Sequence, residues 1–261
     1  MSYFLFGTKS FWTILTIVFA RYFLLALIAF LFFYVIKKQS WRFKKIQWKF
    51  PVPGDYAREI MYSAITSVIF AGIGYIVFLT PVSAYTKAYF DISQYGWGYL
   101  WLTVGVTIVF HDTYFYWMHR AIHYKSVYRI IHRTHHLSTN PSPWAAFAFN
   151  PIEAVFEAGI IILAAFIYPI HPLAIGIFLL FMMTYNVYGH LGYELYPKRF
   201  STSFIGRWIN TSVNHNMHHQ YITGNYGLYF LFWDRWMGTL RPDYDQHFEE
   251  VKSRKRPCLK K

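Results

Sequence analysis

Five long stretches of the chain consist almost entirely of apolar residues. They cover residues 11–36, 60–80, 97–110, 152–168 and 173–189. A helix needs roughly 20 apolar residues to cross a bilayer. The pattern therefore predicts an all-α, multi-pass integral-membrane bundle of about four or five transmembrane helices. The last two stretches are short, so they predict a hairpin that either spans the membrane or dips into it. Arg21 is the one charge within the first stretch.

Composition and charge agree with a membrane protein. Of the 261 residues, 55% are hydrophobic and 14% are charged, against about 25% charged in soluble domains. The net charge of +13 could indicate a nucleic-acid partner. If the first helix runs from outside to inside, however, every lysine and arginine except Lys9, Arg21 and Lys87 falls on the cytoplasmic side. This is the positive-inside rule, and it explains the charge without a nucleic acid.

Nine of the 12 histidines lie in four clusters. They are His119 and His123, then His132, His135 and His136, then His190, and finally His215, His218 and His219. Spacings of three and four residues place side chains on one face of a helix. The predicted topology places all four clusters at the cytoplasmic face, whereas His171 falls in an opposite loop. Nine imidazoles are too many for one metal ion and suit two.

The type of ligand narrows the identity of the metal. Cys258 is the single cysteine, which excludes an intrachain disulfide and cysteine-based zinc or iron–sulfur sites. Imidazole suits zinc, copper, iron and nickel. Nine convergent histidines at a membrane favour two iron ions, with zinc as a substitute that purification can introduce. Such a site uses dioxygen to attack unreactive C–H bonds, and its place at the membrane indicates a lipid substrate.

The residues around the clusters resemble the fatty acid hydroxylase/sterol desaturase superfamily of integral-membrane diiron enzymes. The resemblance covers roughly residues 105–240, and it is carried by Tyr128-Arg129-Ile130-Ile131-His132-Arg133-Thr134-His135-His136 and Trp233-Asp234-Arg235-Trp236-Met237-Gly238-Thr239. It implies a transmembrane bundle with a cytoplasmic helical cap that holds the dimetal site. We expect residues 1–58 to form an N-terminal helix with a basic linker, and residues 59–261 to form the membrane catalytic domain.

Three carboxylates are candidates for supporting the metal ligands. Asp112 lies seven residues before His119, on the same helix face, and could accept a ligand N–H. Asp234 is a second candidate for this role. Glu194 stands where some family members carry a further histidine, so it is the candidate for a tenth ligand. His111 is expected to be a hydrogen-bonding residue inside the bundle.

The sequence therefore predicts an iron- and dioxygen-dependent oxidoreductase of lipid biosynthesis. It would hydroxylate or desaturate an aliphatic carbon of a sterol, fatty acyl chain, sphingolipid or alkylglycerol. A membrane zinc hydrolase is an alternative, but it would need fewer ligands and usually a carboxylate base as in HExxH, which is missing. A metal transporter is another alternative, but it would place its ligands at mid-membrane.

Oxidation of this kind requires electrons. The chain has no dinucleotide fingerprint of the GxGxxG type and no cysteine set for an iron–sulfur cluster. We therefore expect a separate electron donor, a ferredoxin or a cytochrome, at the cytoplasmic face. The stretch from Lys37 to Lys49 and the tail from Lys252 to Lys261 are the basic surfaces expected to attract an acidic donor.

Overall fold

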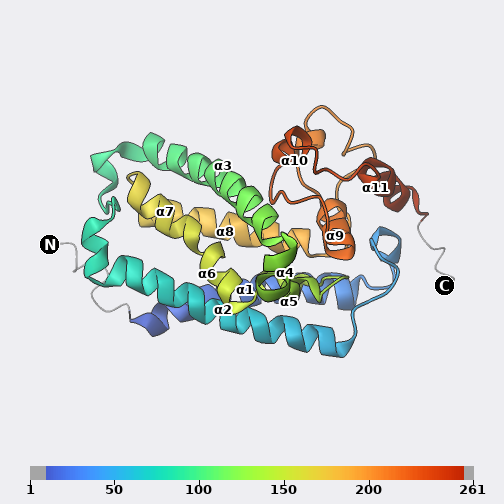
Figure 1. The fold of residues 1–261 in the computed structure, drawn as a ribbon, viewed down its shortest axis with the longest axis horizontal. Coiled ribbons are helices and arrows are strands. Elements are labelled where there is room, and N and C mark those ends of the chain that lie inside the picture. Colours follow the sequence, from blue (N-terminus) through green and yellow to red (C-terminus); the bar gives the residue numbers. More distant parts are fainter. Residues whose placement is uncertain (1–9, 256–261) are drawn as a thin grey trace.

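The chain folds into a bundle of long helices with a group of shorter helices at one end (Figure 1). The computed structural model describes residues 10–255, and within them every regular element is helical. The long helices are α1 (Phe11–Phe30), which continues as the π-helical turn η2 (Leu31–Ile36), α2 (Pro53–Leu79), α3 (Gly96–Ile122) and α8 (Pro172–Gly189). The all-α architecture predicted from the apolar pattern is thus confirmed.

The remaining elements are short. They are η3 (Arg42–Lys44), η4 (Pro81–Tyr85), η5 (Ile92–Gln94), α4 (Lys125–Ile131), α5 (Arg133–His136), η6 (Pro143–Phe147), α6 (Pro151–Glu157), α7 (Gly159–Ile167), η7 (Gly206–Trp208), α9 (Ser212–Tyr221), α10 (Phe232–Trp236) and α11 (Tyr244–Ser253). In Figure 1, α9, α10 and α11 gather at the end of the bundle where α3 and α8 finish. The C-terminal ends of α3 and α8 therefore meet the segment that carries the last histidine cluster.

Within the described residues 10–255, three helices are long and apolar enough to cross a membrane: Phe11–Ile36, Pro53–Leu79 and Pro172–Gly189. Their outer faces are apolar, as at Ile28, which is 64% exposed. Helix α3 has 27 residues, and it carries His111 and Asp112 in its buried face. The protein is thus a membrane protein whose bundle exposes apolar side chains along its candidate spans.

The fourth apolar stretch does not form one helix. It is divided between α6 and α7, and the nine residues of α7 span only about 14 Å, too little to cross a bilayer. The division coincides with Tyr114 of α3, whose hydroxyl donates to the carbonyl of Phe156. A Cβ at Gly159 would collide with that hydroxyl. Tyr114 therefore occupies the place where the helix would otherwise continue.

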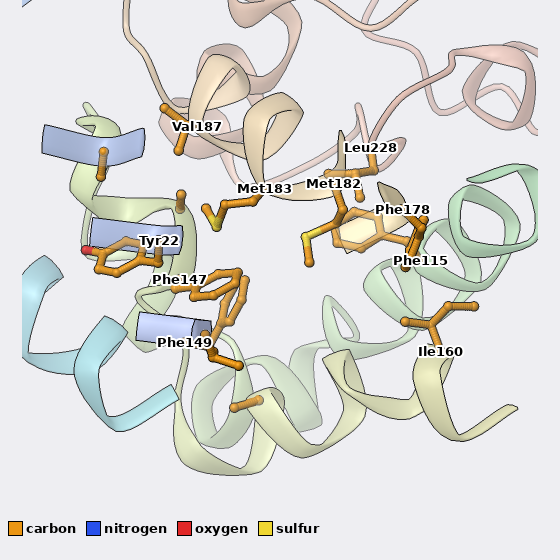
Figure 2. Packing of buried hydrophobic residues seen from close by; sticks show 14 of the residues in the cluster. Tyr22, Phe115, Phe147, Phe149, Ile160, Phe178, Met182, Met183, Val187 and Leu228 are labelled. Atoms are coloured by element: carbon orange, nitrogen blue, oxygen red, sulfur yellow. The ribbon is translucent and has the colours of Figure 1, made fainter. Parts of the chain in front are cut away.

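The core of the bundle forms around an irregular segment that enters it from the metal end. Figure 2 shows Phe147 and Phe149 of this segment meeting Tyr22 of α1 and Met182 and Met183 of α8. The Tyr22 ring stacks on the Phe147 ring with 5.4 Å between centroids. Within this segment, η6 lies between α1, α2 and α8 and packs on all three.

Side chains of the long helices hold the backbone of this buried segment. The carbonyl of Trp144 accepts from the hydroxyls of Tyr22 and Ser63. The carbonyl of Ala146 accepts from the side-chain amide of Asn186. Non-helical backbone inside a membrane bundle requires such partners, because no water is available there. The inserted segment is therefore fixed by its hydrogen bonds as well as by its packing.

The fold leads to a prediction about sidedness. Lys87 follows α2 and η4 at the end of the bundle remote from the histidines, whereas Lys198 follows α8 at the histidine end, and both side chains are exposed. In a Cys258→Ser background, Lys87→Cys should react with an impermeant thiol reagent only from outside the cell. Lys198→Cys should react only after the cytoplasmic face is opened. Reaction of both positions from the same side would contradict the predicted topology.

Candidate metal centre

The structure brings the nine clustered histidines together into two groups. The first group is His119, His123, His132, His136 and His218, and the second is His135, His190, His215 and His219. Within each group, the ligand nitrogens lie within 4.8 Å of one another. All nine predicted ligands are in one of the groups. His171 lies at the opposite end of α8, where its Nδ1 accepts from the Leu173 amide and caps the helix.

The two HxxHH boxes divide their histidines between the groups in opposite ways. In the first box, His132 and His136 face the first group and His135 faces the second. In the last box, His215 and His219 face the second group and His218 faces the first. Residues four apart share a helix face more closely than residues three apart. Each box therefore bridges the two groups, and neither group can be complete without both boxes.

The spacing of the ligand nitrogens in the first group fits a metal ion. The Nε2 atom of His132 lies 3.0 Å from that of His119 and 3.0 Å from that of His136. His123 closes a ring, with its Nε2 3.2 Å from His136 and 3.3 Å from His119. With metal–nitrogen bonds of about 2.1 Å, neighbouring ligands lie about 3.0 Å apart in an octahedral shell and about 3.4 Å apart in a tetrahedral one.

The second group shows the same spacing around His190. Its Nε2 lies 3.3 Å from that of His135 and 3.1 Å from those of His215 and His219. His190 follows α8 directly, and its Nδ1 donates to the Asn186 carbonyl one turn earlier. The end of a transmembrane helix therefore fixes the ligand around which this group is arranged.

Hydrogen bonds on the far side of the rings determine which nitrogens carry protons. Nδ1 donates to a backbone carbonyl in five of the nine histidines; the pairs are His119 with Tyr226, His135 with Ala148, His190 with Asn186, His218 with Gly224 and His219 with Ser138. A carbonyl only accepts, so Nδ1 holds the proton and Nε2 presents a lone pair. Facing lone pairs at 3.0–3.3 Å repel one another, and a cation between them removes the repulsion.

Burial keeps these imidazoles neutral. Burial is the main reason why the pKa values of His135, His215 and His219 lie well below the usual 6.5, and the neighbouring imidazoles lower these pKa values further. The Nε2 of His218 is buried and has no hydrogen-bond partner among residues 10–255. Neutral imidazole with a free lone pair is the form that binds a metal. The residues present therefore fit two metal ions, one for each group.

In the described part of the chain, one carboxylate that the sequence did not single out contacts a ligand ring directly. Glu153 Oε1 lies 2.6 Å from His132 Nδ1, and both side chains are buried. A carboxylate at this place fixes the tautomer of the ligand and raises its basicity. The feature of the sequence that could have indicated Glu153 is a charged residue within the apolar stretch 152–168, close to the Asn150-Pro151 start of α6.

The three carboxylates that the sequence singled out, Asp112 and Asp234 as acceptors for ligand N–H groups and Glu194 as a possible tenth ligand, bind other groups. Asp112 accepts from the amides of Tyr229 and Phe230. Glu194 accepts from the Tyr188 hydroxyl and from the amides of Tyr196 and Val213. Asp234 accepts from the amides of Tyr226 and Gly227 and from Thr239. None of the three contacts an imidazole within the described part of the chain, so the expected contacts of Asp112 and Asp234 with ligand N–H groups are corrected, and Glu194 is in neither histidine group.

These carboxylates bind backbone amides, and the backbone segments that they fix position the ligand histidines. Asp234 fixes the Tyr226 amide, and the Tyr226 carbonyl accepts from His119. Glu194 binds the Val213 amide in the first turn of α9, the helix of the last box. His111 donates to or accepts from Tyr229 through a 2.8 Å contact, as a residue inside the bundle was expected to do. The carboxylates that the sequence singled out therefore support the site through the backbone and not by direct contact with the ligand rings.

Exposure differs between the ligands. His123 is the one member of the first group that is partly exposed, and the four members of the second group are all buried. Four basic residues near it in sequence, Arg120, Lys125, Arg129 and Arg133, are exposed. The first group is thus the one closer to solvent, beneath a positively charged surface.

Comparison with known proteins agrees with this site. The sequence model of the fatty acid hydroxylase family matches residues 104–239. A Delta(7)-sterol 5(6)-desaturase of Gibberella zeae is 30% identical over 178 residues, which are 67% of this chain and 54% of the relative. Lathosterol oxidase of Mus musculus is 31% identical over 189 residues, 71% of this chain and 61% of the relative. No solved structure gives a significant match.

The human lathosterol oxidase is 29% identical over 167 residues, which are 63% of this chain and 54% of that protein. The chain thus spans between half and two thirds of the length of these relatives. The matched family segment contains all nine histidines of the two groups, because His119 and His219 both lie inside it.

The geometry predicts how much metal the protein holds. Protein purified without added metal should contain about two ions per chain by elemental analysis. His135→Ala removes one of the four ligands of the second group and should lower the content to about one. His171→Ala, at the far end of α8, should keep both ions. A single ion in the unaltered protein, or no loss in His135→Ala, would contradict the two-metal site.

A second prediction concerns Glu153. Glu153→Gln keeps the size of the side chain but removes the charge that holds His132, so metal affinity should fall roughly 10- to 100-fold. The exposed Glu250→Gln is the matched control and should retain metal like the unaltered protein. The measurement is the metal that remains after dialysis against graded chelator concentrations. Equal retention by the two variants would show that Glu153 does not support the site.

Proposed function

We propose that this chain, which belongs to the fatty acid hydroxylase family, is an iron- and dioxygen-dependent oxidoreductase that desaturates a sterol-class lipid. The observation that carries the proposal is the pair of all-histidine groups at the end of a membrane bundle. Iron bound there supplies the oxidation of an aliphatic C–H bond by dioxygen. The names of the relatives, Delta(7)-sterol 5(6)-desaturase and lathosterol oxidase, support a sterol substrate.

The overall reaction requires electrons as well as dioxygen. Converting a CH₂–CH₂ unit to CH=CH with one O₂ consumes two electrons and two protons and releases two waters. Hydroxylation with the same reagents inserts one oxygen atom and releases one water. Desaturation and hydroxylation need the same metal ligands, so the site does not distinguish them. Desaturation is preferred because a relative of this chain is named a sterol desaturase.

The protein's own residues supply binding, orientation and exclusion of water. An apolar cavity of 290 Å³ lies inside the bundle and reaches the aromatic residues beside the histidines. The Phe115 ring lies 4.8 Å from the His119 ring, and the Phe149 ring lies 5.1 Å from the His135 ring. A lipid in this cavity would approach the metal groups from the membrane interior, where water is scarce.

An electron donor would approach from the opposite side. His123 is the partly exposed ligand, and Arg120, Lys125, Arg129 and Arg133 surround it in sequence and are exposed. A positive surface attracts an acidic partner and increases its rate of association. We therefore assign the docking of a ferredoxin or cytochrome to this surface.

The basic stretches singled out in the sequence are less suitable for docking than expected. Lys45 is buried, and its Nζ donates to Asn140. Lys252 donates to the Glu194 carbonyl and Arg254 donates to the Lys45 carbonyl, so both cations take part in packing. The rest of the tail, residues 256–261, lies outside the described residues. The surface around His123 is preferred because its cations are exposed and lie close in sequence to a ligand.

Reconstituted activity tests the proposal. Iron-loaded protein with lathosterol and dioxygen should form no product alone and should turn over when a ferredoxin–reductase pair is added. The rate should fall as salt is raised from low to physiological ionic strength, because screening weakens charge-steered docking. His119→Ala and His218→Ala should abolish turnover, and His171→Ala should retain it.

Two outcomes would contradict parts of this proposal. Repeated desaturation of lathosterol without an electron source would contradict the proposed use of two external electrons, because dioxygen would then be reduced only to hydrogen peroxide and not to two waters. A rate that does not depend on salt would remove the electrostatic argument for docking near His123, while leaving the oxidation itself intact.

A further inference from the structure

A patch of exposed apolar side chains lies on the short elements at the histidine end of the bundle, outside the two histidine groups. The segment that ends in η7 contributes Phe204, Ile205 and Trp208, and the end of α10 contributes Trp236 and Met237. Phe204 is 88% exposed, Ile205 67% and Trp236 62%. Apolar side chains of this size are unfavourable in water, and a contiguous group of them usually marks an interaction surface. These five residues are called the exposed patch.

The two segments that carry the exposed patch are joined to each other. The Leu231 amide, directly before α10, donates to the Trp208 carbonyl at 2.9 Å. The Nε of Arg235 donates to the Arg207 carbonyl at 2.7 Å. The guanidinium carbon of Arg207 is 5.3 Å from the centroid of the Trp208 ring, and that of Arg235 is 5.9 Å from it. The apolar side chains and these two cations therefore lie in one region of the surface.

The ends of two long helices fix the level of the exposed patch. The Tyr185 hydroxyl of α8 donates to the carbonyl of Asn210, which follows Trp208 by two residues, at 2.6 Å. Tyr185 lies one turn, about 6 Å, before the end of α8, which is one of the helices able to cross the membrane. The indole N–H of Trp233 donates to the Thr113 hydroxyl of α3 at 3.1 Å, and α10 lies beside the end of α3 in Figure 1. The exposed patch is therefore held at the level where the bundle leaves the bilayer.

The two cations beside the exposed patch have no acidic partner. Arg207 is exposed and Arg235 is partly exposed, and neither forms an ion pair with a carboxylate within residues 10–255. Tryptophan next to arginine is typical of the interface between a bilayer and water. The planar guanidinium also matches the geometry of a phosphate. The charge and the side-chain types therefore suit a surface of phospholipid headgroups.

We propose that the exposed patch inserts into the bilayer interface on the histidine side, and that Arg207 and Arg235 bind phosphates of anionic phospholipids there. The side chains of Phe204, Ile205 and Trp236 would enter the outer edge of the hydrocarbon, while the guanidiniums remain among the headgroups. The chain would thus contact the bilayer through its short helices as well as through its spanning helices. An acidic protein would also be attracted by the two cations, but the level of the patch favours lipid.

The membrane contact would act on the segment that carries the last histidine box. Trp208 lies before α9, the helix of that box, and Trp236 lies after Tyr226, whose carbonyl accepts from His119. The interface would therefore hold both ends of this segment without contacting a metal ligand. This contact does not depend on which reaction the metal groups catalyse.

Spin labels can measure the environment of the exposed patch. In a Cys258→Ser background, Phe204→Cys and Trp236→Cys would each carry a nitroxide on the full chain, with one chain in each phosphatidylcholine–phosphatidylserine nanodisc. Both labels should be more accessible to oxygen, which concentrates in hydrocarbon, than to a water-soluble nickel chelate. Gln246→Cys, at an exposed position of α11, is the matched control and should show the reverse order.

A second measurement tests the headgroup. A fluorophore on Thr202→Cys, an exposed position next to the patch in sequence, should be quenched more by spin-labelled phosphatidylserine than by spin-labelled phosphatidylcholine. Arg207→Gln and Arg235→Gln should each lower this preference roughly fivefold, because each removes a cation near an anionic surface. Arg129→Gln, which removes an exposed cation near His123 in sequence, is the control and should keep the preference.

Three results would overturn the proposal. The first is a greater accessibility of both patch labels to the nickel chelate than to oxygen. The second is equal quenching by the two lipids in the protein that retains both arginines. The third is protection of the labels from the chelate only after an acidic ferredoxin is added, which would assign the patch to the electron donor. The labels at positions 204 and 236 report independently, so one tests the contact even if the other variant fails to elute as a single species.

Discussion

The convergence of nine imidazole lone pairs, eight of them on buried side chains, is the constraint on which the rest of the structure depends. Each ring must be neutral, must hold its proton on the outer nitrogen and must point inward, and a backbone carbonyl enforces this in five rings. Those carbonyls come from α8 and from loops between residues 138 and 226. The loops are therefore as much a part of the site as the helices that carry the histidines.

The site connects two kinds of environment. On one side, α3 carries His119 in its last turn, α8 ends just before His190, and the inserted segment from Pro143 to Phe149 closes the bundle beneath the second group. On the other side, α9 carries the last box and α4 presents a basic surface. A metal held between them would be reached by lipid from within the bilayer and by a donor from the aqueous side. This division explains why one ligand, His123, is partly exposed while the second group is buried.

The carboxylates inside this protein have three different kinds of surroundings. Glu153 contacts a ligand ring, whereas Asp112 and Asp234 bind backbone amides of the segment from Tyr226 to Phe230. Glu157 has no partner in the described chain and faces the cavity. A carboxylate is stable in a low-dielectric interior only where donors or cations surround it. Glu157 is therefore not held by the fold in the way that the other three are.

The sequence by itself determined the helical class, the membrane setting and all nine histidines of the two groups, because apolar runs and i, i+3, i+4 spacing are local properties of the chain. It did not determine which histidine joins which group, nor that α6 and α7 separate where Tyr114 donates to Phe156. It also placed Asp112, Asp234 and Glu194 beside the ligands, although they hold backbone instead. Those features depend on contacts between residues many positions apart, such as His132 with Glu153 and His119 with Tyr226. Only the tertiary structure decided them, since a local pattern fixes the face of a helix but not what that face meets.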